Sequence, residues 1–485
     1  MGRVGFSRVT FEKGINEYYS ASDLPEGYAA AITNWVPEAT GALRVPRGWT
    51  TTSATGISGT KTARGFAYFV PAAGATFVVA QATSGTQYKL NQLLKANLVA
   101  GTWASIETIT SSPSTRPLAM AAGAGYLLYS SPEFPSAFIR KWDGTTASDA
   151  SADAIAGRAL VYHNNRFFTG GATTNSTYLR WCELGDPATW ETSTNFQPIG
   201  QDDGEPIEDL APWDRNLIIG KANSIWYQTG FGPDTFSWHK LDGGGCAPGR
   251  TLIPYPNGIC AIGRERVWNF TGGGFEPISQ PIETSYGMSG NYMSGTYVDG
   301  VVYVCDEGSG SVWAYDLATQ AWHKEMYDSA VEGPGLLWSN SNYMFGGVRV
   351  GSTNPLSLYR LMPGSSRARN TGSAMTFTAT SREFSPQTDK PVRPTVVRNY
   401  EFVIRQRGGT SASTPISVAI YTDGTLKATR TLTLKDAVGT YRYQVSAGFT
   451  GYRHQIIISQ VVGSAEACVC DIEEAWAEYQ GEEPR

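Results

Sequence analysis

An aromatic residue recurs along most of the chain, each time near the end of a strand-like run. The series consists of Trp103, Trp142, Trp190, Trp238, Phe275, Trp322 and Tyr359. Its steps run from roughly 37 to roughly 48 residues. From Trp103 to Trp322 they average about 44, which lies in the window of about 40–50 residues for four-stranded propeller blades. The repeat is degenerate, so unrelated aromatic residues in a strand-rich chain are the alternative explanation.

Strand-like runs accompany this repeat between residues ~60 and ~362. The runs that open the expected units are Gly65–Val70, Leu118–Tyr129, Ala159–Phe168, Ile207–Ile219, Thr251–Ile262, Tyr297–Val304 and Gly335–Phe345. They predict an all-β fold whose main domain, residues 59–362, is a β-propeller of about seven blades, with six or eight still open. The 54 glycines and the 12% of aromatic residues fit many short strands joined by tight turns. The best helix-like stretch is short, at Leu90–Leu98.

One unit shows its hairpins clearly. Val312–Leu317 reads as a strand, Asp316–Gln320 as a tight turn, and a second strand follows at Trp322, as in the outer hairpin of a kelch-type blade. Asp299-Gly300 ahead of an apolar run is a second hairpin signal. The tripeptide Trp-His-Lys at residues 238–240 returns at residues 322–324, which indicates equivalent blade positions.

The two flanks differ from the middle. Residues 1–58 show little regular alternation, which suggests an extended N-terminal arm that could pack on a neighbour, or a strand that closes the propeller. Residues 363–372 are polar and turn-rich and read as a linker. Residues 373–485 suggest a C-terminal β-sandwich. Its expected strands are Phe377–Phe384, Val396–Arg405, Ile416–Tyr421, Thr429–Leu434, Thr440–Val445, His454–Ser459 and Ala467–Glu474.

Charge and apolar runs limit the partners. The net charge is −5, whereas a protein that grips DNA by its phosphates usually has a basic balance. A mildly acidic protein could still line a channel through which DNA slides. Charged residues are 17% of the chain, which fits a surface partly hidden against neighbours. There is no apolar run of about 18 residues and no signal-peptide core at the N-terminus, so neither a membrane span nor general secretion is expected.

The residue types that bind metals do not form a convincing set. Cys182, Cys246, Cys260, Cys305, Cys468 and Cys470 lack zinc spacing and read as reduced thiols. His163, His239, His323 and His454 have no second His or Cys two to four residues further on, and the single acids near His239 and His323 do not make a site. The acidic stretch from Asp202 to Asp209, including Asp203, Glu205 and Glu208, reads as a solvated loop. A calcium loop and a pair of glycosidase acids are its alternatives.

No catalytic motif is found either. Gly243-Gly244-Gly245 and Gly272-Gly273-Gly274 lack the Lys-Ser or Lys-Thr of a phosphate loop and read as turns. Gly308-Ser309-Gly310-Ser311 lacks the spacing of a nucleophile elbow. We therefore expect no enzyme activity, no catalytic, cofactor-binding or metal-binding residues, and no cofactor.

Ordered short motifs nevertheless resemble a family. The first group is Phe11–Asn16, Leu24–Tyr28, Asn34–Pro37 and Gly41–Gly48, and the second is Gly185–Trp190, Asp202–Ile207, Leu217–Lys221, Ser224–Gly230, Val267–Phe270 and Ile278–Ile282. In this order they resemble the tail-nozzle and tail-hub propeller proteins of short-tailed bacteriophages, over roughly residues 10–290. The chain departs at Val45-Pro46-Arg47, where related chains often carry more Arg.

The resemblance implies a structural protein of the virion, made in the host cytoplasm. It would form a ring, typically of six copies, around the DNA exit channel of the tail. Its partners would be copies of itself, the adaptor or portal-side proteins and tail fibres, with DNA passing unbound through the bore. The alternative is a carbohydrate-binding or carbohydrate-active propeller protein, because exposed Trp and Tyr could stack on sugars.

Overall fold

The fold is taken from a computed structural model. It describes residues 4–45, 49–51, 62–72, 74, 76–84, 87–94, 102–110, 117–286, 293–306, 311–326, 334–340, 343–348, 358–361, 375–385, 394–406, 415–435, 437–462 and 470–481. The expected linker at 363–372, Cys468 and Gly308–Gly310 lie outside these residues. No helix in the described ranges is long and apolar enough to cross a membrane.

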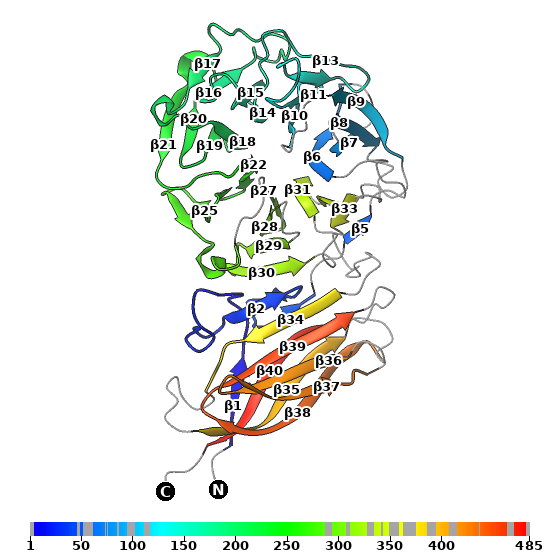
Figure 1. Cartoon of the computed structure of the whole chain (residues 1–485), viewed down its shortest axis with the longest axis vertical. Coiled ribbons are helices and arrows are strands. Elements are labelled where there is room, and N and C mark those ends of the chain that lie inside the picture. The colour runs from blue at the N-terminus through cyan, green and yellow to red at the C-terminus, as the bar shows by residue number, and fades with distance from the viewer. Residues whose placement is uncertain are drawn as a thin grey trace.

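The larger domain is a β-propeller of seven four-stranded blades, as expected (Figure 1). The first blade consists of β6 (Thr62–Phe69), β7 (Phe77–Ser84), β8 (Gln87–Leu94) and β9 (Ala104–Thr110). The second consists of β10 (Ala119–Gly123), β11 (Tyr126–Ser130), β12 (Arg140–Trp142) and β13 (Ala147–Asp149). The third consists of β14 (Ala159–His163), β15 (Arg166–Gly170), β16 (Tyr178–Trp181) and β17 (Phe196–Pro198). The fourth blade consists of β18 (Ile207–Trp213), β19 (Asn216–Lys221), β20 (Ile225–Thr229) and β21 (Ser237–Leu241). The fifth consists of β23 (Leu252–Tyr255), β24 (Gly258–Ile262), β25 (Val267–Phe270) and β26 (Phe275–Pro277).

The sixth blade consists of β27 (Met293–Val298), β28 (Val301–Asp306), β29 (Ser311–Asp316) and β30 (Ala321–Met326), so the expected kelch-like outer hairpin is confirmed. Asp299 and Gly300 both have positive φ in its first turn. The seventh blade takes β31 (Pro334–Asn340), β32 (Tyr343–Val348) and β33 (Leu358–Leu361), and its fourth strand is β5 (Trp49–Thr51). A strand from the N-terminal segment therefore closes the propeller.

Short elements connect the blades. These are β22 (Gly249–Arg250) and the 3₁₀ turns η2 (Gln201–Asp203), η3 (Pro233–Thr235) and η4 (Gln280–Ile282). The two triple-glycine stretches lie in the connections from β21 to β22 and from β25 to β26, as expected of turns.

The smaller domain is the expected sandwich, and each of its seven predicted strands forms. They are β34 (Met375–Ser381), β35 (Thr395–Gln406), β36 (Ile416–Thr422), β37 (Thr425–Leu432), β38 (Gly439–Gly451), β39 (His454–Val462) and β40 (Cys470–Gly481). One sheet contains β38, β35 and β40, and the other contains β34, β39, β36 and β37. The last strand begins and ends later than Ala467–Glu474.

The N-terminal segment is extended, but it packs within its own chain. Its strands are β1 (Val4–Val9), β2 (Ala29–Thr33), β3 (Val36–Pro37) and β4 (Leu43–Arg44). Strands β1 and β4 pair with β40 of the sandwich. Strand β2 pairs with β30 of the propeller on one side and with β34 of the sandwich on the other.

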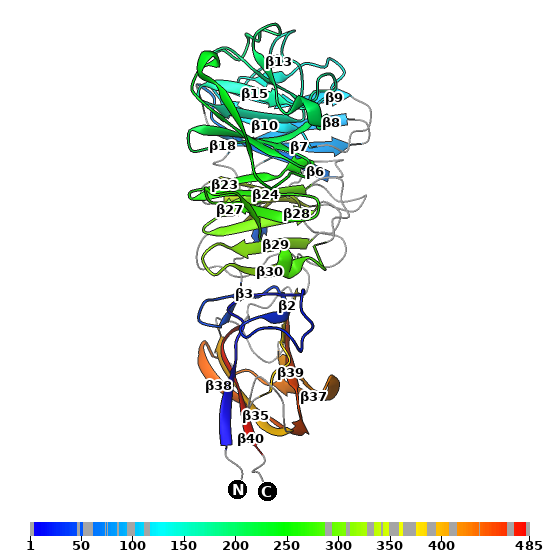
Figure 2. The same ribbon diagram turned by 90° about the vertical axis from the view of Figure 1, so that its left-hand side faces the viewer.

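Strand β2 therefore joins the sixth blade to one sheet of the sandwich, in a single sheet of ten strands (Figures 1 and 2). One hydrophobic core extends across this joint and includes Ile253, Trp322, Trp35, Phe377 and Tyr400. Because the core is continuous, the propeller and the sandwich form one elongated unit.

The prediction of a helix at Leu90–Leu98 is wrong for residues 90–94, the part of this range that the structure describes. Residues 87–94 form β8, which pairs with β7 and β9 in the first blade. The leucine spacing suggests a helical face, but position between two strands decides the conformation, because strand pairing overrides local propensity. The run Leu118–Tyr129 likewise contains two strands with a turn at residues 124 and 125.

Candidate functional site

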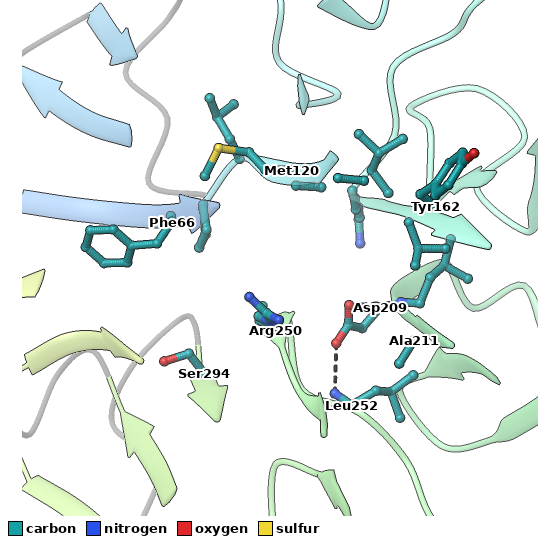
Figure 3. Close-up of a pocket in the computed structure, with 18 of the residues that line it drawn as sticks. Phe66, Met120, Tyr162, Asp209, Ala211, Arg250, Leu252 and Ser294 are labelled. Carbon is teal, nitrogen blue, oxygen red and sulfur yellow. Dashed lines mark hydrogen bonds between the residues drawn. The ribbon is translucent and has the colours of Figure 1, made fainter. Parts of the chain in front are cut away.

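A cavity of about 310 Å³ lies inside the ring of innermost strands (Figure 3). Its lining comes from β6, β10, β14, β18, β22, β23 and β27. Apolar groups form much of the wall, among them those of Phe66, Leu118, Met120, Leu160 and Leu252. Polar groups form the rest, including those of Arg158, Asp209 and Ser294.

Arg250 is the side chain that projects into this cavity (Figure 3). Its strand, β22, pairs in parallel with Met293 and Ser294 of β27. The preceding Gly249 has φ of +127°, and a Cβ atom there would lie 2.0 Å from the Met293 carbonyl oxygen. Only glycine permits this close approach, so the Gly-Arg pair sets Arg250 at the axis.

Asp209 of β18 is the nearest counter-charge, but its carboxylate is occupied by backbone donors. Its Oδ2 accepts from the N–H groups of Thr251 and Leu252 at 2.7 and 2.8 Å. Its Oδ1 accepts from the N–H of Leu210 at 2.8 Å. Enclosure by the protein raises the pKa of Asp209 to about 6, although these donors and Arg250 act to lower it.

The Arg250 guanidinium has no hydrogen bond or ion pair to any described residue. The Arg250 side chain is exposed to solvent within the cavity. Partial desolvation by the surrounding strands lowers the pKa of Arg250, and the charge of Asp209 opposes that change. Arginine nevertheless stays protonated in proteins. The second arginine of the lining, Arg158, differs because it pairs with the buried Glu208 at 2.5 Å.

A second, more open hollow of about 570 Å³ shares Pro212 and Pro254 with the axial cavity. Trp213, Tyr255 and Tyr297 line it. Pro212 and Pro254 therefore separate two neighbouring hollows, and the second one has an aromatic lining. Sequence reasoning missed both, because their residues come from separate blades and form no local motif.

The acidic stretch from Asp202 to Asp209 does not converge on one point. Asp203 pairs with Lys221, whose fully buried Nζ also donates to the carbonyls of Ile199 and Gly200 at 2.9 and 3.0 Å. Glu205 accepts from the backbone N–H of Asn223 at 3.0 Å. Glu208 and Asp209 have the separate partners described above.

The four histidines also lie apart. His239 of β21 and His323 of β30 occupy fourth strands of their blades, which confirms their equivalent positions. His323 is buried 3.5 Å from Glu325, and His239 is exposed and stacks on Tyr227. Burial lowers the pKa of His163 and of His454, so these two rings favour the neutral form.

Within the described residues, no group of three His, Cys, Asp or Glu side chains could hold a metal ion. The described cysteines, Cys182, Cys246, Cys260, Cys305 and Cys470, are free thiols and buried. Burial raises the pKa of Cys182 to about 11, so this thiol stays protonated and unreactive.

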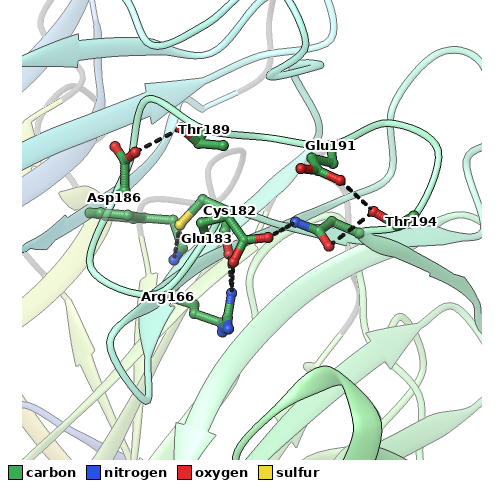
Figure 4. Close-up of polar contacts among 9 residues, drawn as sticks. Arg166, Cys182, Glu183, Asp186, Thr189, Glu191 and Thr194 are labelled. Atoms are coloured by element: carbon green, nitrogen blue, oxygen red, sulfur yellow. Dashed lines mark hydrogen bonds and ion pairs between the residues drawn. The ribbon is translucent and has the colours of Figure 1, made fainter.

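The motif at residues 185–190 forms a capped turn on the outer side of the third blade (Figure 4). Asp186 accepts from the Ala188 N–H at 2.9 Å and from the Thr189 hydroxyl at 2.7 Å, which lowers its pKa. Trp190 is buried and donates to the Pro187 carbonyl at 2.9 Å. These bonds explain the motif as a local structural device.

Arg166 of β15 stabilises the start of the same loop through a hydrogen bond and an ion pair. It donates to the Cys182 carbonyl at 2.7 Å and pairs with Glu183 at 3.3 Å, and Glu183 also accepts from Asn195 at 2.8 Å (Figure 4). Thr194 donates to Glu191 at 3.0 Å. Asp186, Glu183 and Glu191 thus each have a structural partner in this loop.

The N-terminal motifs meet at the joint between the two domains. Asn34 donates to the Thr376 carbonyl at 2.7 Å, and the fully buried Trp35 donates to the Cys470 carbonyl at 3.1 Å. Arg44 pairs with Glu38 at 2.8 Å and also with Asp471 and Glu473 of β40. Their contacts bind the segment to the sandwich of the same chain.

Comparison with known proteins gives similarity of shape only. No family model matches the chain, and no curated protein matches it. The WD40 domain of Pan2 from Neurospora crassa is similar with a TM-score of 0.43 and 10% identity, over 66% of this chain and 97% of that one. A nidogen–laminin complex is similar with a TM-score of 0.27 and 12% identity, over 55% of this chain and 81% of that one. The propeller assignment therefore rests on the strand order described above.

Proposed function

We propose that the chain is a structural subunit of a short-tailed phage tail, a ring-forming nozzle or hub protein around the DNA exit channel. The observation that carries the proposal is where the motifs of the resemblance lie. Residues 11–45 build the joint that makes the propeller and the sandwich one continuous unit. A subunit that stands between rings under the pressure of DNA ejection needs this kind of stiff connection.

In this proposal the DNA passes between subunits and not through a propeller. The axial cavity of about 310 Å³ is blocked by side chains and is far too small for a duplex. The bore is the space enclosed by about six copies. Adaptor or portal-side proteins would bind one end of the ring, and fibres could bind the other.

Mass photometry of the purified full chain, with and without tails that lack this protein, tests the proposal. The expected result is a closed oligomer, about six copies, or incorporation at the tail axis seen by electron microscopy. A chain that stays monomeric at every concentration and never joins a tail contradicts it.

One observation favours carbohydrate binding as a second candidate function. The second hollow is lined by the aromatic side chains of Trp213, Tyr255 and Tyr297, together with Asp214. Aromatic faces and polar rims suit sugars. Glycan-array binding that is lost in Trp213→Ala, but kept when the exposed Phe231 is changed to Ala, would support this function. Equal binding by both variants, or none by wild type, would count against it.

A further inference from the structure

The axial cavity combines a charge without a described partner and a wall that is partly apolar. The Arg250 guanidinium points into it without a hydrogen bond or ion pair to any described residue (Figure 3). The Arg250 side chain is exposed to solvent within the cavity, so a solute that enters can reach its guanidinium. The cavity is therefore built around an arginine whose five donors are available.

The rest of the lining decides what kind of anion fits. Phe66, Met120, Leu160 and Leu252 offer an apolar surface and no further charge. Arg158 is already neutralised by Glu208 at 2.5 Å. Asp209 stands beside Arg250, so a second negative charge on a ligand would be repelled.

We propose that the axial cavity binds a small organic monocarboxylate, with the carboxylate on Arg250 and an apolar body against the innermost strands. Arginine matches a carboxylate through two parallel N–H···O bonds. A phosphate dianion fits less well, since one arginine next to an aspartate gives too little positive charge. The ligand would occupy every copy of the chain, whether or not the copies form a ring.

Isothermal titration of the full chain at pH 7 with hexanoate tests this site. Hexanamide serves as the uncharged analogue and inorganic phosphate as the inorganic anion. We expect saturable binding of one hexanoate per chain, and at least tenfold weaker binding of hexanamide and of phosphate.

Variants assign the binding to Arg250. Arg250→Met should weaken hexanoate binding at least tenfold, and Arg250→Lys should weaken it less, because the charge remains but the paired donors do not. The exposed Arg264, changed to Met, is the matched control and should bind as wild type does. Thermal unfolding of each variant without ligand shows whether it is folded.

Three results would overturn the proposal. They are no saturable binding of hexanoate at tens of millimolar, equal affinity for hexanamide, and an unchanged affinity in a folded Arg250→Met. Phosphate binding as strong as that of hexanoate would also overturn the assignment to a monocarboxylate.

Discussion

Asp209 holds two blades together at the propeller axis. Asp209 lies on β18 of the fourth blade, and its carboxylate accepts hydrogen bonds from the N–H groups of Thr251 and Leu252, where the fifth blade starts. Removing an acceptor from enclosed backbone donors costs about 1–3 kcal/mol for each group left without a partner. At the residue scale, this one side chain therefore contributes more than its solvent-facing acidic neighbours.

Replacing Asp209 by Ala should lower the free energy of unfolding by about 2–4 kcal/mol, since three backbone donors lose their acceptor. Chemical denaturation of the full chain measures this. The exposed Asp202, changed to Ala, is the control and should stay within about 0.5 kcal/mol of wild type. Equal effects of the two changes would show that the Asp209 bonds contribute nothing.

The same carboxyl predicts a pH effect. The folded pKa of about 6 lies above the ordinary value of 3.8, so the folded chain binds this proton more tightly than the unfolded chain does. Its contribution to stability is present below about pH 4 and is lost as the pH rises through 6. Wild type should therefore gain stability relative to Asp209→Asn as the pH falls from 6 to 4. The measured quantity is the unfolding free energy of wild type minus that of the variant, which should rise over this window. A difference that is flat across this window would contradict the raised pKa.

At the scale of elements, the joint depends on backbone contacts that admit no side chain. Gly14 has φ of +72° and forms a parallel bridge with Trp322, and a Cβ atom there would lie 2.4 Å from the Trp322 carbonyl oxygen. Ile15 donates its N–H to the same oxygen at 2.9 Å. The N-terminal segment can approach the sixth blade only if this residue is glycine.

Gly14→Ala should therefore lower the unfolding free energy by about 2 kcal/mol or more, through clash and an unfavourable φ. Gly232 is the matched control, because it has φ of −134° and open space at its Cβ position. Thermal melts of the two variants compare them directly. If both variants have the melting temperature of wild type, the N-terminal segment is not packed against the sixth blade as tightly as described.

Strands were predictable from the sequence where their signals are local. The hairpin turn at Asp299-Gly300 and the seven sandwich strands follow from short-range patterns. The joint between the domains could not be predicted, because Thr33 of β2 pairs with Lys324 of β30, far away in the sequence. The cavity could not be predicted either, because Asp209 and Arg250 meet only when successive blades close around the axis. The aromatic repeat gave the blade number although Trp142 lies in a third strand and Trp238 in a fourth.

At the scale of the whole molecule, one core crosses from the propeller into the sandwich. It includes Val304 and Trp322 of the sixth blade as well as Phe377 and Ile458 of the sandwich. Domains that share a core do not unfold independently, whereas loosely connected domains do. We therefore expect scanning calorimetry to show the sandwich and the propeller unfolding in one transition. Two resolved transitions would mean that the joint is weaker than the continuous sheet indicates.

The central claim is that this stiff unit works as one of several copies in a ring around DNA. Mass photometry of the purified full chain, followed by electron microscopy of any oligomer, tests it most directly. The account predicts a closed ring of about six copies, or its formation when tails lacking the protein are added. A protein that remains monomeric in both conditions would contradict the claim.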